Sequence, residues 1–273
     1  MAHWFDIHPQ NPQARLLAQA AVHLRQGAVI AYPTDSCYAL GCHLDDKAAA
    51  ERLRKIRKFD KDHQFTLVCR DLSEIATYAR VDNWQFRLLR QFTPGPYTFV
   101  LAATKELPRR VAHEKRKTIG IRVPDNAVTQ ALLATLGEPL ISCTLQFPGE
   151  SLPVSDPYEY EDRLEREVDV VLTAGNCGLD PTTVIDLSEG SVRILRQGND
   201  NPESETSFGI TGIVTSRLSS EGSERTSRAV RLTRRCTGRR PARRPGGRSA
   251  RRRETADASA VPGRRRCDRA PPT

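Results

Sequence analysis

The sequence predicts an α/β domain with a mixed sheet, in which parallel and antiparallel strands both occur. Apolar runs typical of strands alternate with segments whose apolar residues recur at helical spacing. Some of these strand runs are separated by helices, and others only by short turns. A wholly parallel sheet needs a long crossover after every strand, so the short turns favour a sheet with both strand directions.

The first half of the domain contains four predicted helices and two predicted strands. Residues 14–25 carry apolar side chains at helical spacing and end before Gly27, which is typical of a helix C-terminus. Residues 28–32 are almost continuously apolar and predict a buried strand. Asp45 can cap a helix that runs through Arg54. The other elements predicted here are a strand at 65–69 and helices at 71–78 and 82–91.

The second half of the domain is dominated by strands. Its runs combine β-branched and apolar residues between polar turns, and no internal repeat occurs. The predicted strands are 97–103, 118–123, 140–145, 168–173, 182–187 and 192–196, and the predicted helices are 126–136 and 158–167.

The charge of the chain changes abruptly near residue 200. Residues 201–273 contain 18 Arg, no Lys and 7 acidic residues, whereas residues 1–200 contain 24 basic and 26 acidic side chains. The first 200 residues are long enough for one domain with its own core. We therefore predict a domain at 1–200 and an Arg/Pro/Gly-rich tail at 201–273 that is disordered or unselected. A nucleic-acid-binding arm is the alternative interpretation of this tail.

Cysteine usage and hydropathy favour a soluble, cytoplasmic protein. The 7 cysteines form no CxxC pair and no regular frame, so neither a zinc site nor a disulfide scaffold is indicated. No apolar run approaches the roughly 18 residues that span a bilayer, and the N-terminal residues lack the charged-then-apolar order of a secretion signal. We expect free thiols and no membrane partner.

The segment PTDSCYALG, at residues 33–41, indicates an anion site. Thr34 and Ser36 offer hydroxyl groups after a predicted strand, and Gly41 permits a close backbone approach. Lys55 and Arg57 follow in the next segment. Since positions i and i+2 diverge on a helix, both cations can reach one ligand only if the helix ends near Lys55. The alternative is an ordinary pair of surface charges in a cation-rich stretch.

Polar residues also lie at or near the ends of later strands, which is where open α/β sheets bind ligands. Arg122 ends an apolar strand, and we expect it to face a ligand, because a guanidinium there otherwise needs a buried acidic partner. Ser142, Thr144, Thr182 and Thr183 add hydroxyl groups. Each of these hydroxyl residues, taken alone, is also explained by a structural role in a strand.

Taken together, these motifs resemble the YrdC-like family of threonylcarbamoyl-AMP synthases. The matching segments, in order, are PTDSCYALG, KIR, TPGPYTFVL, KTIGIRVP, SCT, PTTVIDL and ILRQG, and they cover roughly residues 8–198. KIRKFDKDHQFTLVCRDLSE and EKRKTIGIRVP are most similar to the YciO branch. The resemblance implies a twisted, open α/β fold with a large concave basic cavity.

The resemblance also implies an activity. Members of the family condense L-threonine, bicarbonate and ATP into threonylcarbamoyl-AMP and pyrophosphate, the precursor of the N6-threonylcarbamoyl group on adenosine 37 of certain tRNAs. Mg²⁺ accompanies ATP and is held mainly through its phosphates. The implied partners are therefore ATP, L-threonine and bicarbonate, with tRNA or double-stranded RNA as a further candidate.

Each polar residue takes a role under this resemblance. Lys55, Arg57 and Ser142 are the catalytic candidates, because carbamate formation and adenylation need phosphate binding and charge stabilisation rather than a protein nucleophile. Thr34 and Arg122 match the amino-acid end, where a guanidinium pairs with a carboxylate. The other expected contacts are Thr144, Thr182, Thr183 and Arg196 for the nucleotide and His63 for the substrate.

Two departures from the family pattern leave alternatives open. Thr144 stands where the synthases have Asn, and the prolines that usually flank the segment after KxR are missing from KIRKFDKDHQF. A hydroxyl offers fewer hydrogen bonds than an amide, so a nucleotide contact is lost. The alternatives are a double-stranded RNA-binding protein with little or no synthase activity, which recognises phosphates and shape, and a hydrolase of acyl or carbamoyl phosphates.

Overall fold

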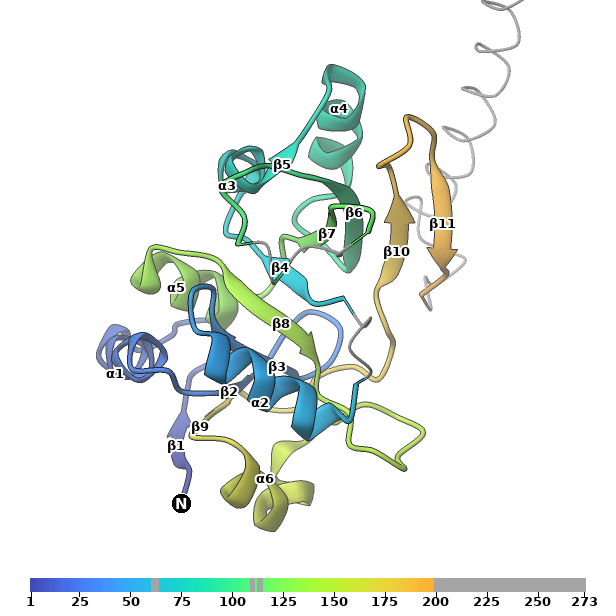
Figure 1. Cartoon of the computed structure of the whole chain (residues 1–273). Coiled ribbons are helices and arrows are strands. Elements are labelled where there is room, and N and C mark those ends of the chain that lie inside the picture. The colour runs from blue at the N-terminus through green and yellow to red at the C-terminus, as the bar shows by residue number, and fades with distance from the viewer. Residues whose placement is uncertain (60–63, 109–110, 112–114, 199–273) are drawn as a thin grey trace, which may run out of the picture. The chain divides into compact units, whose positions relative to one another are not determined.

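The computed structural model describes residues 1–59, 64–108, 111 and 115–198 (Figure 1). The chain divides into two units, Met1–Ser219 and Ser220–Thr273, and all described residues belong to the first unit. The predictions for His63 and for the 201–273 tail lie outside the described residues.

An open mixed sheet forms the centre of the domain. Its strands follow one another in the order β1-β9-β2-β3-β8-β4-β7-β6-β10-β11, and β5 adds to β6. The sheet combines parallel pairs (β1–β9, β2–β9, β4–β7 and β6–β10) with antiparallel pairs, which confirms the predicted mixed sheet. The strands are β1 (His3–Asp6), β2 (Ile30–Tyr32), β3 (Ala39–His43), β4 (Thr66–Val68), β5 (Ala79–Arg80), β6 (Tyr97–Ala103), β7 (Thr118–Arg122), β8 (Leu140–Thr144), β9 (Val170–Thr173), β10 (Thr183–Asp186) and β11 (Arg193–Arg196).

Helices cover both faces of the sheet. Side chains alternate along each strand, so β2 places Ile30 and Tyr32 in one apolar cluster and Ala31 in the other. The first cluster packs under α1 and α5, which lie side by side, and the second packs under α2, α3, α4 and α6 (Figure 1). The helices are α1 (Ala14–Arg25), α2 (Lys47–Arg57), α3 (Leu72–Tyr78), α4 (Asn83–Phe92), α5 (Ala127–Leu136), the 3₁₀-helix η1 (Pro157–Tyr160) and α6 (Glu161–Glu167).

The prediction for the second helix was wrong at both ends. Its cap is Asp46, whose carboxylate accepts a hydrogen bond from the Ala49 amide at 2.8 Å, and not Asp45. The helix continues to Arg57 and ends where Lys58 adopts a left-handed backbone conformation with φ 50°. Residues 47–57 contain no Gly or Pro, so the sequence has no local signal that would end the helix at Arg54 or mark its true end.

Three strands were missed by the sequence analysis, namely β1, β3 and β5. β5 has 2 residues, and β1 has 4 residues without alternation of buried and exposed side chains. β3 contains Gly41, which is depleted in strands. These segments form strands because strands distant in the sequence supply their hydrogen-bond partners. The local sequence of each segment does not contain this signal.

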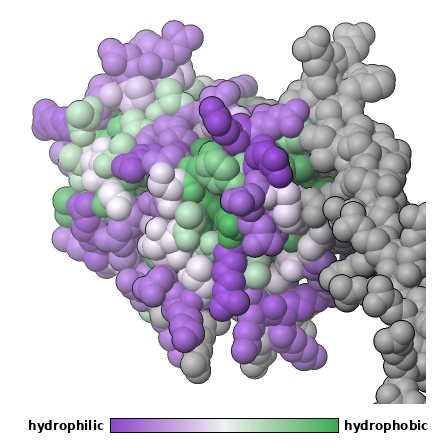
Figure 2. Space-filling model, turned by 90° about the horizontal axis from the view of Figure 1, so that it is seen from above, coloured by the Kyte–Doolittle hydropathy of each residue, from purple (hydrophilic) through white to green (hydrophobic). Residues whose placement is uncertain are grey.

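The surface of the domain is mostly hydrophilic on the face seen in Figure 2, with hydrophobic residues gathered near its centre. Within the described residues, no helix combines the length and the apolar character that crossing a membrane requires.

Candidate functional site

The domain contains a cavity of about 660 Å³. It lies on the sheet face that α1 and α5 cover, but farther along the sheet, over β8, β4, β7, β6 and β10. Ser142, Thr66, Gly120 and Val100 form a row of register partners across four of these strands, and all four line the cavity. The volume lies within the range typical of small-molecule sites.

Three arginines supply the charge of the cavity wall. Arg57 ends α2, Arg122 ends β7 and Arg196 ends β11. Within the described part of the chain, no aspartate or glutamate lines the cavity. A hollow with guanidinium groups and hydroxyls, and without lining carboxylates, suits an anionic ligand such as a phosphate or a carboxylate.

Arg122 lines the cavity, but the premise that it lacks an acidic partner was wrong. Its Nη2 donates to Oδ1 of Asp35, and the two side chains are each 10% exposed. Nη2 also lies 3.4 Å from Thr34 Oγ1. Asp35 stands 87 residues before Arg122, and the PTDS turn brings it to the end of β7.

Arg57 lines the cavity from the last turn of α2. Its Nη2 lies 3.5 Å from Gln146 Oε1, and its guanidinium lies 4.7 Å from the centre of the Phe59 ring. Its Nε is buried and has no hydrogen-bond partner within the described residues. Burial lowers the pKa of Arg57, but a guanidinium remains protonated at neutral pH. Arg57 therefore keeps donor capacity for an incoming anion.

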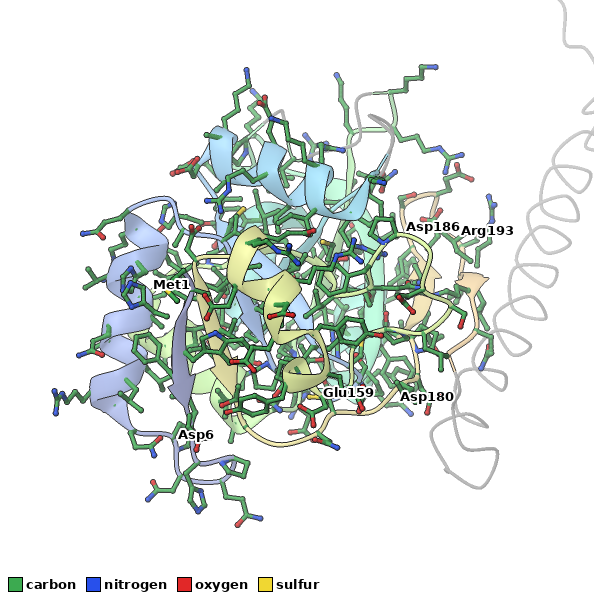
Figure 3. The ribbon with its side chains drawn as sticks, turned by 90° about the horizontal axis from the view of Figure 1, so that it is seen from below. Met1, Asp6, Glu159, Asp180, Asp186 and Arg193 are labelled. Carbon is green, nitrogen blue, oxygen red and sulfur yellow. The ribbon has the colours of Figure 1, made fainter. Side chains whose placement is uncertain are left out.

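Arg196 is held by the loop that enters β10. Its Nε donates to the carbonyl of Thr182 at 3.0 Å, and its Nη2 donates to Thr182 Oγ1 at 3.0 Å. Thr182 Oγ1 lies 3.1 Å from Thr98 Oγ1, so two hydroxyls and one guanidinium form a small network on the wall. The strand that carries Arg196 is itself held by its pairing with β10. Asp186 of β10 and Arg193 of β11 are register partners in this hairpin and lie side by side in Figure 3.

Thr183 does not share this wall. Since side chains alternate along a strand, Thr182 and Val184 line the cavity while Thr183 points to the opposite face. Its Oγ1 accepts a hydrogen bond from the Gly198 amide at 2.9 Å. Thr183 is not among the residues that line the cavity, so its predicted nucleotide contact has no support from its position.

Ser142 and Thr144 line the cavity on β8, but the Ser142 hydroxyl is already engaged. It donates to the Leu40 carbonyl at 3.0 Å, so the hydrogen bond of 2.6 Å with Tyr32 comes from the Tyr32 hydroxyl. Burial raises the pKa of Tyr32 above its usual range, and its hydroxyl stays protonated. Tyr32 is a cavity residue that the sequence analysis missed, although it directly precedes the PTDS turn.

Thr34 lines the cavity, but its hydroxyl is part of the turn. Oγ1 donates to the Cys37 carbonyl at 2.6 Å and accepts from the amides of Ser36 at 3.1 Å and Cys37 at 3.3 Å. With these contacts the hydroxyl has no remaining donor for a ligand. Its function in this structure is to fix the turn that carries Asp35.

Lys55 does not reach the cavity wall. It is exposed and lies two residues before the end of α2, so it diverges from Arg57 around the helix. The prediction that both cations serve one ligand therefore has support for Arg57 only. Cys143 on β8 is buried, and burial raises its pKa to about 12. Its thiol stays neutral and unreactive at physiological pH.

Gly41 is needed for the geometry of this site. A Cβ at Gly41 would lie 2.9 Å from Cε1 of the buried Tyr32 ring. We expect Gly41→Ala to displace this ring, weaken its hydrogen bond to Ser142 and lower the free energy of unfolding by about 1–3 kcal/mol. Urea denaturation measures the loss. Gly120→Ala is the matched control, since its Cβ approaches Thr98 Cγ2 only to 3.3 Å. Equal losses in both variants would contradict the steric argument.

The fold and the cavity define a class of open, mixed-sheet α/β proteins with an arginine-lined hollow on one sheet face. Comparison with known proteins narrows this class. The Sua5/YciO/YrdC family model, described as "Telomere recombination", matches residues 22–198, and the chain belongs to this family. The predicted family and its open mixed-sheet fold are thereby confirmed.

Relatives place the chain near the YciO branch. It is 54% identical to the uncharacterized protein YciO of Escherichia coli K12 over 198 residues, which are 72% of this chain and 96% of that protein. The crystal structure of E. coli YciO has a TM-score of 0.71 and 53% identity, and the match covers 74% of this chain and 98% of that chain. A threonylcarbamoyl-AMP synthase of Vibrio vulnificus YJ016 is 31% identical over 159 residues, which are 57% of this chain and 84% of that enzyme.

Two more distant solved structures share the fold. Sua5 of P. abyssi complexed with L-threonine has a TM-score of 0.66 at 21% identity, and the match covers 71% of this chain and 57% of that chain. Full-length HypF in its phosphate- and nucleotide-bound form has a TM-score of 0.58 at 21% identity, with 67% of this chain and 29% of that chain covered.

Proposed function

We propose that this protein is an enzyme that condenses L-threonine, bicarbonate and ATP into threonylcarbamoyl-AMP and pyrophosphate, and that it serves tRNA modification. The observation that carries the proposal is the cavity. Arg57, Arg122 and Arg196 come from three separate elements and converge on a hollow with no lining carboxylate among the described residues. The synthase relatives, the L-threonine complex of Sua5 and the nucleotide complex of HypF support this choice of ligands.

The donor set fits a nucleoside triphosphate. Arg57 offers a buried Nε without a partner within the described residues. Thr182 engages Nε and Nη2 of Arg196, and Nη1 has no hydrogen bond to any other described residue. These two guanidiniums are the residues that would hold the phosphates. Among the described residues, no three His, Cys, Asp or Glu side chains cluster as a metal site. Mg²⁺ would accordingly be carried on the phosphates of ATP.

The reaction needs no protein nucleophile, and the main tasks of the protein are to position the substrates and to stabilise charge. The threonine nitrogen forms a bond to the carbon of bicarbonate with loss of water, and a carbamate oxygen then attacks the α-phosphorus as pyrophosphate leaves. Fixed guanidiniums stabilise the charge that develops on the phosphate oxygens. Thr182 and Thr98 hold Arg196 in position, and positioning of this kind is a major source of rate enhancement.

The test is a synthase assay on the full chain. ATP, labelled bicarbonate and L-threonine are incubated with the protein, and threonine-dependent pyrophosphate and labelled threonylcarbamoyl-AMP are measured. We expect both products, with pyrophosphate release dependent on threonine. Absence of product together with absence of ATP binding would overturn the proposal. Binding of double-stranded RNA without product would instead favour the non-catalytic alternative.

A further inference from the structure

Gln146 is a cavity residue that the sequence analysis did not select. It follows β8 by two residues, and Ser142, Thr144 and Gln146, at alternate positions, all line the cavity. Alternate residues of an extended chain project to the same side. The amide that Thr144 does not supply is therefore present on this wall at Gln146.

The amide of Gln146 bridges two parts of the wall. Its Nε2 donates to the Glu150 carbonyl at 3.0 Å, and its Oε1 lies 3.5 Å from Nη2 of Arg57. A carbonyl only accepts and a guanidinium only donates, so these two contacts fix which end of the amide faces which partner. The bridge joins the loop after β8 to the last turn of α2, although the two residues are 89 positions apart in the sequence.

Arg57 is oriented by this contact. Within the described residues, Gln146 Oε1 is the one hydrogen-bond acceptor that Arg57 contacts, and the Phe59 ring supports its guanidinium from one side. A long side chain that is held before the ligand arrives loses less conformational entropy on binding. Nε of Arg57 remains buried and without a partner in the described part of the chain, so it keeps a donor for the ligand.

The three cavity arginines are held by acceptors of different charge. Arg122 donates to the carboxylate of Asp35, which offsets its charge. Arg57 is held by an amide, and Arg196 by the carbonyl and the hydroxyl of Thr182. A neutral acceptor orients a guanidinium and leaves its net positive charge in place. Among the described cavity residues, the charge that is not offset by a bound carboxylate therefore lies on Arg57 and Arg196.

We propose that Gln146 is a positioning residue, which holds the guanidinium of Arg57 toward the phosphate groups of a nucleotide without offsetting its charge. Gln146 acts through Arg57 and need not touch the ligand itself. A carboxylate at the same position would accept a stronger hydrogen bond, but it would compete with the phosphate for the guanidinium. This assignment deepens the proposed function, on which it rests, by giving the reason for a neutral amide beside Arg57.

The experiment measures binding of ATP and of inorganic pyrophosphate to the full chain by calorimetry. Gln146→Met keeps the length of the side chain and removes the acceptor, whereas Gln146→Glu keeps the acceptor and adds a negative charge. Both variants are made alone and together with Arg57→Ala. Gln91→Met, on the exposed face of α4, is the matched control. Melting temperatures show whether each variant folds.

We expect Gln146→Met to weaken the binding of both ligands by about threefold to tenfold, the effect of one hydrogen bond between an orienting group and its partner. Gln146→Glu should weaken it by about tenfold to a hundredfold, because the carboxylate offsets the charge of Arg57. Gln91→Met should bind as the wild type does. With Arg57→Ala already present, Gln146→Met should cause no further loss, since its effect passes through Arg57.

Two results would overturn the proposal. One is unchanged affinity in either Gln146 variant. The other is an equal loss with and without Arg57, because that loss would not pass through the guanidinium. If Gln146→Met does not fold, Gln146→Glu decides by the same comparison.

The synthase assay separates this inference from the proposed function. Binding of ATP or pyrophosphate that depends on Gln146 through Arg57, without threonine-dependent product, would support the inference and contradict the synthase. Product formation by the wild type, without coupling between Gln146 and Arg57, would overturn the inference and leave the synthase. Failure of both ligands to bind the wild-type protein would also overturn the inference.

Discussion

Arg122→Met is expected to lower the free energy of unfolding by about 3–5 kcal/mol. The substitution leaves Asp35 buried without a counter-charge, and removal of one partner of a buried ion pair has this magnitude. Guanidinium chloride denaturation measures the change. Arg87→Met, on the exposed face of α4, is the matched control and is expected to lie within about 0.5 kcal/mol of the wild type.

A double variant isolates the charge effect. Arg122→Met with Asp35→Leu removes both charges, so it is expected to recover a large part of the stability that the single variant loses. If the double variant is as unstable as Arg122→Met, the loss comes from packing at the end of β7 and not from the isolated carboxylate.

Arg57→Ala is expected to weaken ATP binding by about tenfold to a hundredfold, since hydrogen bonds to charged groups contribute about 1.5–3 kcal/mol. Arg57 lines the cavity and has a buried Nε with unused donor capacity within the described residues. Titration calorimetry with ATP at fixed salt measures the affinity. Increasing the salt concentration should reduce the difference between variant and wild type, because the contact is ionic.

Lys55→Ala is the control for this measurement. Lys55 carries the same charge two residues earlier in α2, but it is exposed and lies off the cavity wall. We expect a change of less than about threefold, as for an exposed ionic contact. Equal losses in the two variants would mean that general surface charge, and not the cavity, attracts the nucleotide.

The fold could be predicted largely from the sequence because its longer elements carry clear local signals. The strand at 97–103 was predicted with its observed bounds, and Asn126 caps α5 as its type and position suggest. β1, β3 and β5 were missed because they are short and are stabilised by pairing with strands that are distant in the sequence. Their formation depends on contacts that periodicity does not contain.

The site could be predicted in part, and its failures have specific causes. Arg122 was selected because it ends an apolar strand, and Arg196 because the resemblance to the family implied it; both line the cavity. Lys55 was wrongly predicted to face the same ligand as Arg57. The end of α2 depends on the left-handed conformation of Lys58, and no Gly or Pro at that position indicates it in the sequence. Asp35 was missed because its significance arises only when the chain brings it beside Arg122.

The β10–β11 hairpin lies at the margin of the sheet and supplies one wall of the cavity. β11 is exposed at all four positions, and β10 joins the sheet only through β6. Amide hydrogens of this hairpin should therefore exchange with solvent sooner than those of the central strands. Because the hairpin supplies Arg196 and is entered through Thr182, each local opening removes one wall of the hollow. Under the proposed function, this opening would let product leave through the margin of the sheet without movement of the core.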